Sequence, residues 1–206
     1  CGGGSWAGGG SGFRRSLPNH GISMSDVNDD RYEPSGLPYR MAVLCYLWTE
    51  DDQLLMLHRR KHPNPGMYSP IGGKMEISLG ETPHECARRE IHEEAGIEVP
   101  AEDIRMFAMV AEKAYQGEMH WLLFCFEVTR KIDPAELPRS EFDEGTLEWV
   151  HVDEIENLNI PETDRKVLWP ALKPRRHAGG FLMLEIDCGG EELVWKVVED
   201  SARPSE

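Results

Sequence analysis

The strongest local signal in the sequence is a capped helix near the middle of the chain. Thr82 is a preferred N-cap residue, Pro83 suits the first helical position, and Glu85 completes a capping box. Gly96 supplies the left-handed residue at which many helices stop. A helix is therefore predicted from about Pro83 to Ala95, and it constrains what can surround it.

One stripe of this helix is apolar, because Ala87, Ile91 and Ala95 recur at i, i+4 and i+8. That stripe has to pack against another layer. Strand-like segments occur on both sides of the helix without a regular strand–helix repeat, which predicts an α/β sandwich with a mixed sheet. The predicted strands are Met41–Trp48, Gln53–His58, Ile104–Ala111, Met119–Val128, Thr146–Val150, Phe181–Ile186 and Glu192–Val198, with a long loop at 62–73, a turn at Gly189-Gly190 and a second helix over Pro161–Leu172.

Three glutamates lie on the predicted helix. Glu90, Glu93 and Glu94 stand at i, i+3 and i+4, and at roughly 100° per residue they fall within an arc of about 100°. Like charges so placed destabilise a helix unless they share a cation. Carboxylate ligands suit Mg²⁺, with Mn²⁺ as a possible substitute. The alternative is an ordinary solvated helix face.

The residues around these glutamates resemble the Nudix box, G-x5-E-x7-R-E-U-x-E-E-x-G-U. Every position matches from Glu81 to Ile97, and the seven-residue spacer 82–88 has the right length. The departure lies between Gly73 and Glu81, where seven residues stand in place of five. Glu76 and Gly80 indicate that the two extra residues lie within 77–79.

This resemblance implies the Nudix-type α/β/α sandwich and the hydrolysis of a nucleoside diphosphate linked to another moiety. It implies that Glu90, Glu93 and Glu94 hold divalent ions and that the Gly73 carbonyl completes their inner shell. In such a reaction, cations neutralise pyrophosphate charge and lower the pKa of the attacking water.

The resemblance further implies that Arg89 pairs with Glu81 and braces the loop against the helix. Either Glu93 or Glu94 is the candidate for polarising the attacking water, and the sequence does not choose between a ligand and a general base. A second acidic cluster, formed by Glu141, Asp143 and Glu144, either adds a metal ligand or is a solvated loop.

Over roughly 41–198 the chain is similar to the 8-oxo-dGTP diphosphatases, which convert oxidised purine nucleoside triphosphates to the monophosphate and pyrophosphate. Where that family has a Trp-Asn pair, this chain has Tyr68 and Ser69. The family's Trp-Pro-Asp-Asp segment corresponds to residues 160–163 of this chain, and Asp164 is the next residue. Tyr68 is expected to stack on a base, and Glu162 or Asp164 to accept its N–H groups. The alternative is a packed loop tyrosine and ordinary first-turn helix acids.

Candidate phosphate-binding residues precede and follow the loop. Arg59 and Lys61 end the second predicted strand, and Lys74 follows the paired glycines. A basic run at a strand end is alternatively just a solvated edge. The aromatic residues Trp121 and Phe126 are interpreted as core rather than as a platform for a base.

Composition narrows the possible partners. The net charge is −15, from 22 Lys and Arg against 37 Asp and Glu, which argues against binding to a nucleic acid polymer or an anionic membrane. Five cysteines without a CxxC pair indicate a reducing, cytoplasmic setting. The expected partner is a nucleotide, bound by a monomer or homodimer. We expect one folded domain at 36–200. The glycine-rich segment 1–35 and the tail 201–206 are expected to be disordered.

Three kinds of alternative function remain open at this point. The first is another substrate within the fold: ADP-ribose, a dinucleoside polyphosphate or a sugar nucleotide. The second is a non-catalytic Nudix module that senses a nucleotide, against which the intact set of Glu90, Glu93 and Glu94 argues. The third is an isomerase of the same fold acting on isopentenyl diphosphate, whose additional acid–base residues cannot be identified in this sequence.

Overall fold

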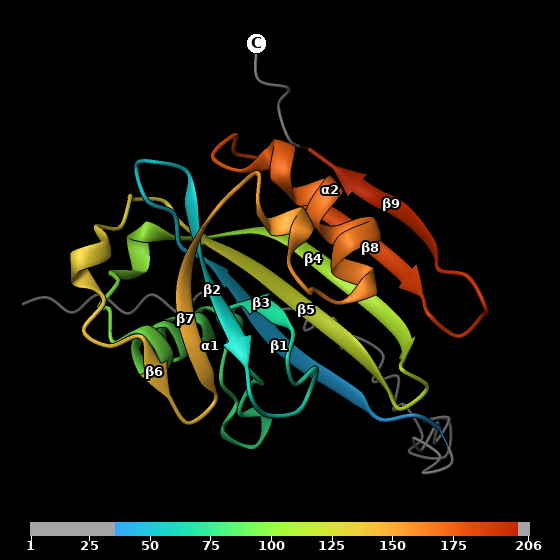
Figure 1. Ribbon diagram of the computed structural model, residues 1–206. Coiled ribbons are helices and arrows are strands. Elements are labelled where there is room, and N and C mark those ends of the chain that lie inside the picture. Colours follow the sequence, from blue (N-terminus) through green and yellow to red (C-terminus); the bar gives the residue numbers. More distant parts are fainter. Residues whose placement is uncertain (1–35, 202–206) are drawn as a thin grey trace, which may run out of the picture. The chain divides into compact units, whose positions relative to one another are not determined.

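The chain folds around two β-sheets, seen in Figure 1, in a computed structural model that describes residues 36–201. The first sheet has five strands in the order β1-β5-β4-β8-β9, and the second has four in the order β3-β2-β7-β6. The predicted disordered segments 1–35 and 201–206 lie outside the described residues, except for Ser201, whose N–H donates to the Phe181 carbonyl. The strands are β1 Tyr39–Tyr46, β2 Gln53–Arg59, β3 Tyr68–Pro70, β4 Ile104–Tyr115, β5 Met119–Val128, β6 Glu141–Phe142, β7 Gly145–His151, β8 Leu182–Asp187 and β9 Val194–Asp200.

The five-stranded sheet is mixed, as predicted. Strands β1 and β5 pair in parallel, as do β4 and β8, whereas β4–β5 and β8–β9 are antiparallel. The second sheet is antiparallel throughout. The helices are α1 Pro83–Glu90, continued by a π-helical turn Ile91–Ala95, and α2 Trp169–Leu172, preceded by a π-helical turn Asp164–Leu168.

Strand β1 shows why helices cover both faces of the five-stranded sheet. Successive side chains of a strand point to opposite faces. Val43 and Cys45 accordingly belong to the hydrophobic cluster that contains the buried residues of α1. Leu44 and Tyr46 face a second cluster, which contains the buried residues of α2. The two helices therefore lie on opposite faces of the sheet (Figure 1), which is the predicted α/β/α sandwich.

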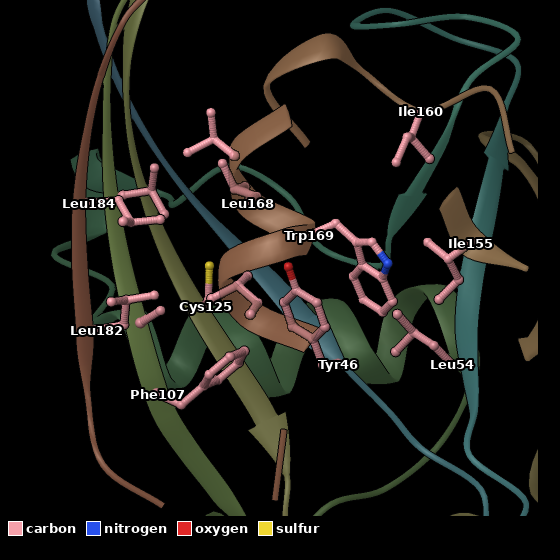
Figure 2. Packing of buried hydrophobic residues seen from close by; sticks show 14 of the residues in the cluster. Tyr46, Leu54, Phe107, Cys125, Ile155, Ile160, Leu168, Trp169, Leu182 and Leu184 are labelled. Carbon is pink, nitrogen blue, oxygen red and sulfur yellow. The ribbon is translucent and has the colours of Figure 1, made fainter. Parts of the chain in front are cut away.

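The cluster on the α2 face holds the largest aromatic side chains. Figure 2 shows Tyr46 and Trp169 packed among aliphatic residues from both sheets and from the helical segment. The Trp169 ring stacks on Trp48 with centroids 6.3 Å apart. Burial of aromatic rings contributes much of the stability of a core of this kind, so the segment that carries α2 is held firmly against the sheet.

Three expected elements differ from the structure. The loop at 62–73 contains a short strand, because Tyr68–Pro70 pairs with β2. The predicted helix Pro161–Leu172 begins at Glu162 and is interrupted by a π-helical turn, a local widening that periodicity does not reveal. The last strand runs over Val194–Asp200 rather than Glu192–Val198.

Two further expectations concern cysteines and membranes. The cysteines within the described residues are free thiols: Cys45, Cys86 and Cys125 are buried, and Cys188 is partly buried. None of the helices in residues 36–201 has the length and apolarity that a bilayer crossing needs.

Candidate functional site

Helix α1 begins as the sequence predicts. The Thr82 hydroxyl accepts a hydrogen bond from the Glu85 backbone N–H, and the Glu85 carboxylate accepts one from the Thr82 N–H. These reciprocal bonds satisfy two of the N–H groups that a helix start leaves unpaired. At the other end Gly96 has a φ of 69°, the left-handed conformation that glycine adopts without strain. The caps thereby fix the position of the residues between them.

The three glutamates, expected together on one face of the helix, differ in burial. Glu90 and Glu94 are buried, at 9% and 4% exposed, whereas the Glu93 side chain is 56% exposed. The π-helical turn over Ile91–Ala95 explains the difference. Each residue of such a turn advances by less than the roughly 100° of an α-helix, so Glu94 comes closer to alignment with Glu90 while Glu93 rotates away.

The loop before the helix contacts both buried glutamates. The Gly72 backbone N–H donates a hydrogen bond of 2.8 Å to Glu94 Oε2. At Gly73 an added Cβ would lie 2.3 to 2.6 Å from the Glu90 carboxylate, so only glycine leaves room for that carboxylate. The Gly73 carbonyl accepts a hydrogen bond from the Val43 N–H and has a second lone pair for another partner.

Arg89 joins loop and helix through several hydrogen bonds. Its Nε donates to Glu81 Oε1 at 2.8 Å, its Nη1 to Glu90 Oε1 at 2.7 Å and to Glu93 Oε2 at 3.1 Å. A further hydrogen bond goes from Nη2 to the Lys74 carbonyl oxygen. The guanidinium holds the pKa of Glu81 down at about 2. The pairing of Arg89 with Glu81 is thus present in the structure as the resemblance implied.

The extra residues in the box loop form a 3₁₀ turn at Ile77–Leu79. Ile77 and Leu79 are exposed, and the turn closes at Gly80, which is left-handed with a φ of 72°. The Glu81 carboxylate accepts a hydrogen bond from the Glu76 N–H across the base of the turn. The insertion therefore projects into solvent and leaves the contacts of Gly72 and Gly73 with the helix intact.

The positive charges near Glu90 and Glu94, those of Arg89 and Arg59, do not offset the burial of these carboxylates. Burial raises the pKa of Glu94 to about 8, partly offset by the Gly72 hydrogen bond and reinforced by the charges of Glu90 and Glu144. Burial also raises the pKa of Glu90, although Arg89 opposes this. A divalent cation bound beside these oxygens would supply the missing charge, and hard oxygen donors suit Mg²⁺ or Mn²⁺.

The chemistry of these donors therefore fits such a cation, but their arrangement is not a finished cage. Among residues 36–201 no group of three acidic, histidine or cysteine side chains is placed to hold a metal ion. Arg89 occupies one oxygen of Glu90 and one of Glu93. Each of these two carboxylates keeps a second oxygen with which it can bind a cation.

A cavity of about 370 Å³ opens beside this helix and loop. Of the residues proposed for the site from the sequence, it brings together seven: Arg59, Ser69, Gly73, Lys74, Glu90, Glu144 and Asp164. Arg59 is held in the wall by a 2.8 Å hydrogen bond from its Nε to the Pro63 carbonyl. Cations and oxygen donors at one end of a cavity suit a phosphate-bearing ligand.

Three expected substrate contacts lie outside the lining of the cavity. Tyr68 stacks on His58 with ring centroids 4.5 Å apart, and its hydroxyl donates to Glu148. Glu162 forms an exposed ion pair with Lys166, one turn further along. Lys61 lies 3.8 Å from Asp143 on the surface. For Tyr68, Glu162 and Lys61 the structure thus agrees with the alternative interpretation, a packed or solvated position.

The second acidic cluster divides in the same way. Glu141 pairs with Arg60 and Asp143 with Lys61, both at the surface. Glu144, by contrast, lines the cavity and lies 3.9 Å from the Arg59 guanidinium. Its charge raises the pKa of both Glu90 and Glu94, which places it near them.

The structure adds lining residues that the sequence did not single out for this role. They include Trp121, which was expected to belong only to the core, and Glu112 near the end of β4. The inward position of Glu112 could be inferred from the sequence. Side chains alternate between the two faces of a strand, so Glu112 lies on the same face as the buried residues Ala108 and Val110. An acid at an inward position of a strand is uncommon and marks a candidate site.

Comparisons with known proteins agree with this geometry. The family model described as the NUDIX domain matches residues 38–169. The uncharacterized Nudix hydrolase YvcI of Bacillus subtilis (strain 168) is 31% identical over 125 residues, which is 60% of this chain and 73% of that protein.

Solved structures share the fold. The crystal structure of a MutT protein from Bacillus halodurans is 26% identical, with a TM-score of 0.60 over 77% of this chain and 97% of its own. The NUDIX domain of Shewanella oneidensis NrtR, solved with ADP ribose, is 13% identical, with a TM-score of 0.54 over 71% of this chain and 94% of its own, a likeness in fold alone. Because the family model covers more than half of the chain and includes the helix, the loop and the cavity described above, this chain belongs to the NUDIX family.

Proposed function

We propose that this NUDIX protein is a metal-dependent pyrophosphohydrolase that cleaves a nucleoside diphosphate derivative. The observation that carries the proposal is the pair of buried glutamates, Glu90 and Glu94, which contact the Gly72-Gly73 loop, with Glu90 in the lining of the cavity. Burying two carboxylates is costly, and the charges of Arg89 and Arg59 offset this cost only in part. The cost is explained if the site exists to bind a cation together with an anionic substrate.

A divalent cation bound there would neutralise phosphate charge and acidify the attacking water. We assign Glu90, Glu93 and Glu94, with the Gly73 carbonyl, to hold it. Glu93 or Glu94 is also assigned to orient the water. Glu93 is the more exposed candidate, and among the described residues its carboxylate pairs with Arg89 alone.

Arg89 and Glu81 are assigned a positioning role. Their ion pair connects the loop that carries Gly73 to the helix that carries the glutamates. Glu144 lies close enough to influence the charge of Glu90 and Glu94, so we include it as a further candidate ligand.

We infer the class of substrate from the remaining residues that line the cavity. Arg59 and Lys74 are the cations of the cavity wall and suit the phosphates, while Ser69 and Asp164 can hydrogen-bond to the rest of the nucleotide. An oxidised purine nucleoside triphosphate, hydrolysed to the monophosphate and pyrophosphate, is the proposed substrate. Asp164 is the part of the expected base-binding segment that supports this choice, since Glu162 points away from the cavity.

A substrate panel tests the proposal. The purified protein is incubated with Mg²⁺ and, in turn, oxidised and unmodified purine nucleoside triphosphates, ADP-ribose, a dinucleoside polyphosphate and a sugar nucleotide, and the products are resolved. We expect the fastest release of pyrophosphate from an oxidised purine triphosphate. Faster cleavage of ADP-ribose or a dinucleotide would replace the substrate but keep the reaction.

Matched variants separate the site from the rest of the molecule. Glu94→Gln is expected to lose most of the activity, whereas Glu102→Gln, an exposed glutamate in the turn Ala101–Asp103, should keep it. Nucleotide binding without metal-dependent turnover by the unmodified protein would contradict the enzyme and favour a nucleotide-sensing module.

A further inference from the structure

A buried carboxyl in the cavity has no part in the proposed hydrolysis. Glu112 is 3% exposed and lines the cavity. Its Oε1 is fully buried and has no hydrogen-bond partner among residues 36–201, and the hydroxyl of Thr163, another lining residue, donates to Asp164. Buried polar atoms are paired in nearly all folded proteins, so an unpaired oxygen on a side chain that lines a cavity indicates a missing partner.

Glu112 lies at the opposite end of the cavity from the phosphate-binding residues. The Gly73 carbonyl and Lys74 pair with β1 at its outer edge. Strand β5 separates β1 from β4, which carries Glu112 (Figure 1). Two inter-strand spacings amount to roughly 10 Å. A nucleotide with its phosphates at Lys74 would therefore extend its base towards Glu112.

The surface between these ends is apolar. Leu44 and Leu123 line the cavity on β1 and β5, and Trp121 is the direct neighbour of Glu112 on β5. An apolar wall that ends at a few polar groups, here Glu112 with Asp164, is the usual environment of an aromatic ring system that has a hydrogen-bonding edge. Polyphosphate, which offers only acceptors and negative charge, does not fit that end.

The groups that face Glu112 determine its protonation. Burial, reinforced by the charge of Asp164, raises the pKa of Glu112 to about 8. The other ionisable groups coupled to it are Tyr115, Cys125 and Cys188, whose own pKa values burial raises, so they are uncharged at neutral pH. No lysine, arginine or histidine is among these groups. A neutral carboxyl presents one O–H donor and one carbonyl acceptor side by side.

We infer that Glu112 is a specificity-determining residue that binds the base of the nucleotide, with its carboxyl donating one hydrogen bond and accepting another. The complementary group is a base edge on which a ring nitrogen or carbonyl acceptor adjoins an N–H donor. This inference rests on the proposed function only in that the ligand is a nucleotide. Binding of the base does not require cleavage of the pyrophosphate bond.

Three variants test the inference. Glu112→Leu removes both hydrogen bonds, Glu112→Gln keeps one donor and one acceptor without a charge, and Glu185→Leu is the control. Glu185 lies on β8, pairs with Lys196 and does not line the cavity. Affinities for GTP, ATP and inorganic triphosphate are measured by calorimetry with Ca²⁺ in place of Mg²⁺, and KM and kcat are measured in Mg²⁺.

Glu112→Leu should weaken binding of at least one nucleotide by about ten- to hundredfold and leave inorganic triphosphate unchanged. Glu112→Gln should retain nucleotide affinity within about threefold. The loss should fall on KM, because the phosphate-binding end is intact. A Leu variant with unchanged unfolding temperature excludes a merely structural role; if it does not fold, Glu112→Met takes its place.

Several results would overturn the inference. Equal weakening of triphosphate and nucleotides would assign Glu112 to the phosphates, and a Gln variant as weak as Leu would mean that the ionised carboxylate binds. Failure of the unmodified protein to bind either nucleotide would also overturn it. Nucleotide binding without hydrolysis, by contrast, would contradict the proposed function while leaving the comparison of the Glu112 variants decisive.

Discussion

Gly73 shows how a single residue without a side chain can organise the site. The space that its Cβ would occupy is filled by the Glu90 carboxylate, which burial and Arg89 hold in a defined position. Since the obstructing atoms are the end of a side chain, a substitution would move Glu90 rather than break the backbone. Function should therefore suffer more than stability.

We expect Gly73→Ala to lower kcat/KM by at least about tenfold, because 1 Å misplacements at catalytic centres have costs of this order or larger. Steady-state kinetics and urea denaturation measure the two effects. Gly190→Ala is the control, since an added Cβ there meets no atom closer than 3.5 Å. Equal activity of Gly73→Ala and the unmodified protein would show that the Glu90 position does not matter.

The raised pKa of Glu112 predicts a pH dependence of stability. The folded state keeps this carboxyl protonated up to about pH 8, while the unfolded chain releases the proton near its ordinary pKa. The folded state thus binds more protons between about pH 5 and 8, so the free energy of unfolding falls as pH rises through this window. The stabilisation is complete only below the unfolded pKa.

Glu112→Gln removes this proton and should make the slope shallower by up to about 1.4 kcal/mol per pH unit. Urea titrations at pH 5, 6, 7 and 8 without divalent cations measure it. Asp164, whose pKa burial raises to about 7, contributes to the slope in both proteins. Identical slopes would indicate that Glu112 ionises normally in the folded state.

At the scale of elements, helix α1 shows what the sequence could and could not reveal. Its caps and its buried stripe follow from local chemistry, and the structure has both. The π-helical turn over Ile91–Ala95 has no comparable signature, because it changes the angle between residues without changing which are apolar. The exposure of the Glu93 side chain, next to the buried Glu90 and Glu94, could therefore not be predicted.

Tyr68 and Glu162 lie outside the lining of the cavity for a related reason. Tyr68 and Glu162 were chosen by their place along the chain, but pairing of Tyr68–Pro70 with β2 directs Tyr68 onto His58, away from the cavity. Tertiary pairing of this kind is not encoded within a loop motif. The inward position of Glu112 could be predicted from the alternation of side chains along its strand, yet its role depends on a cavity that also includes β1 and the loop at 62–74, which are distant from it in sequence.

Thr82→Ala should remove the N-cap of α1 and lower the free energy of unfolding by about 1 kcal/mol. Thr82→Ser keeps the hydroxyl that accepts from the Glu85 N–H and should cost much less. Urea denaturation of both variants measures the difference. If Ala and Ser are equally stable, the capping box does not contribute to stability.

At the scale of the whole molecule, the separate contacts form one cavity with two chemically different ends. The groups around Glu90, Arg59 and Lys74 are acidic and basic and are proposed to face the phosphates, and the apolar wall leads to Glu112. The protein carries a net charge of −15, so an anionic nucleotide would approach against a repulsive field. The divalent cation proposed at the glutamates would offset this repulsion where the phosphates are proposed to bind.

Cation binding should consequently stabilise the folded protein. A ligand at 100 times its Kd adds about 2.7 kcal/mol to the free energy of unfolding, so Mg²⁺ or Mn²⁺ should raise the Tm in calorimetry. The combined Glu90→Gln and Glu94→Gln variant should lose this increase. Equal increases in both proteins would place the cation elsewhere on the surface.

The central claim is that Glu90, Glu93 and Glu94 form the metal-dependent centre that cleaves a pyrophosphate bond. The most direct measurement is the initial rate of hydrolysis of the best nucleotide of the panel, for the unmodified protein and for Glu94→Gln, with Mg²⁺ and after chelation. We predict a fall of at least about a hundredfold from either change. A rate that survives both the substitution and the removal of metal would contradict the account.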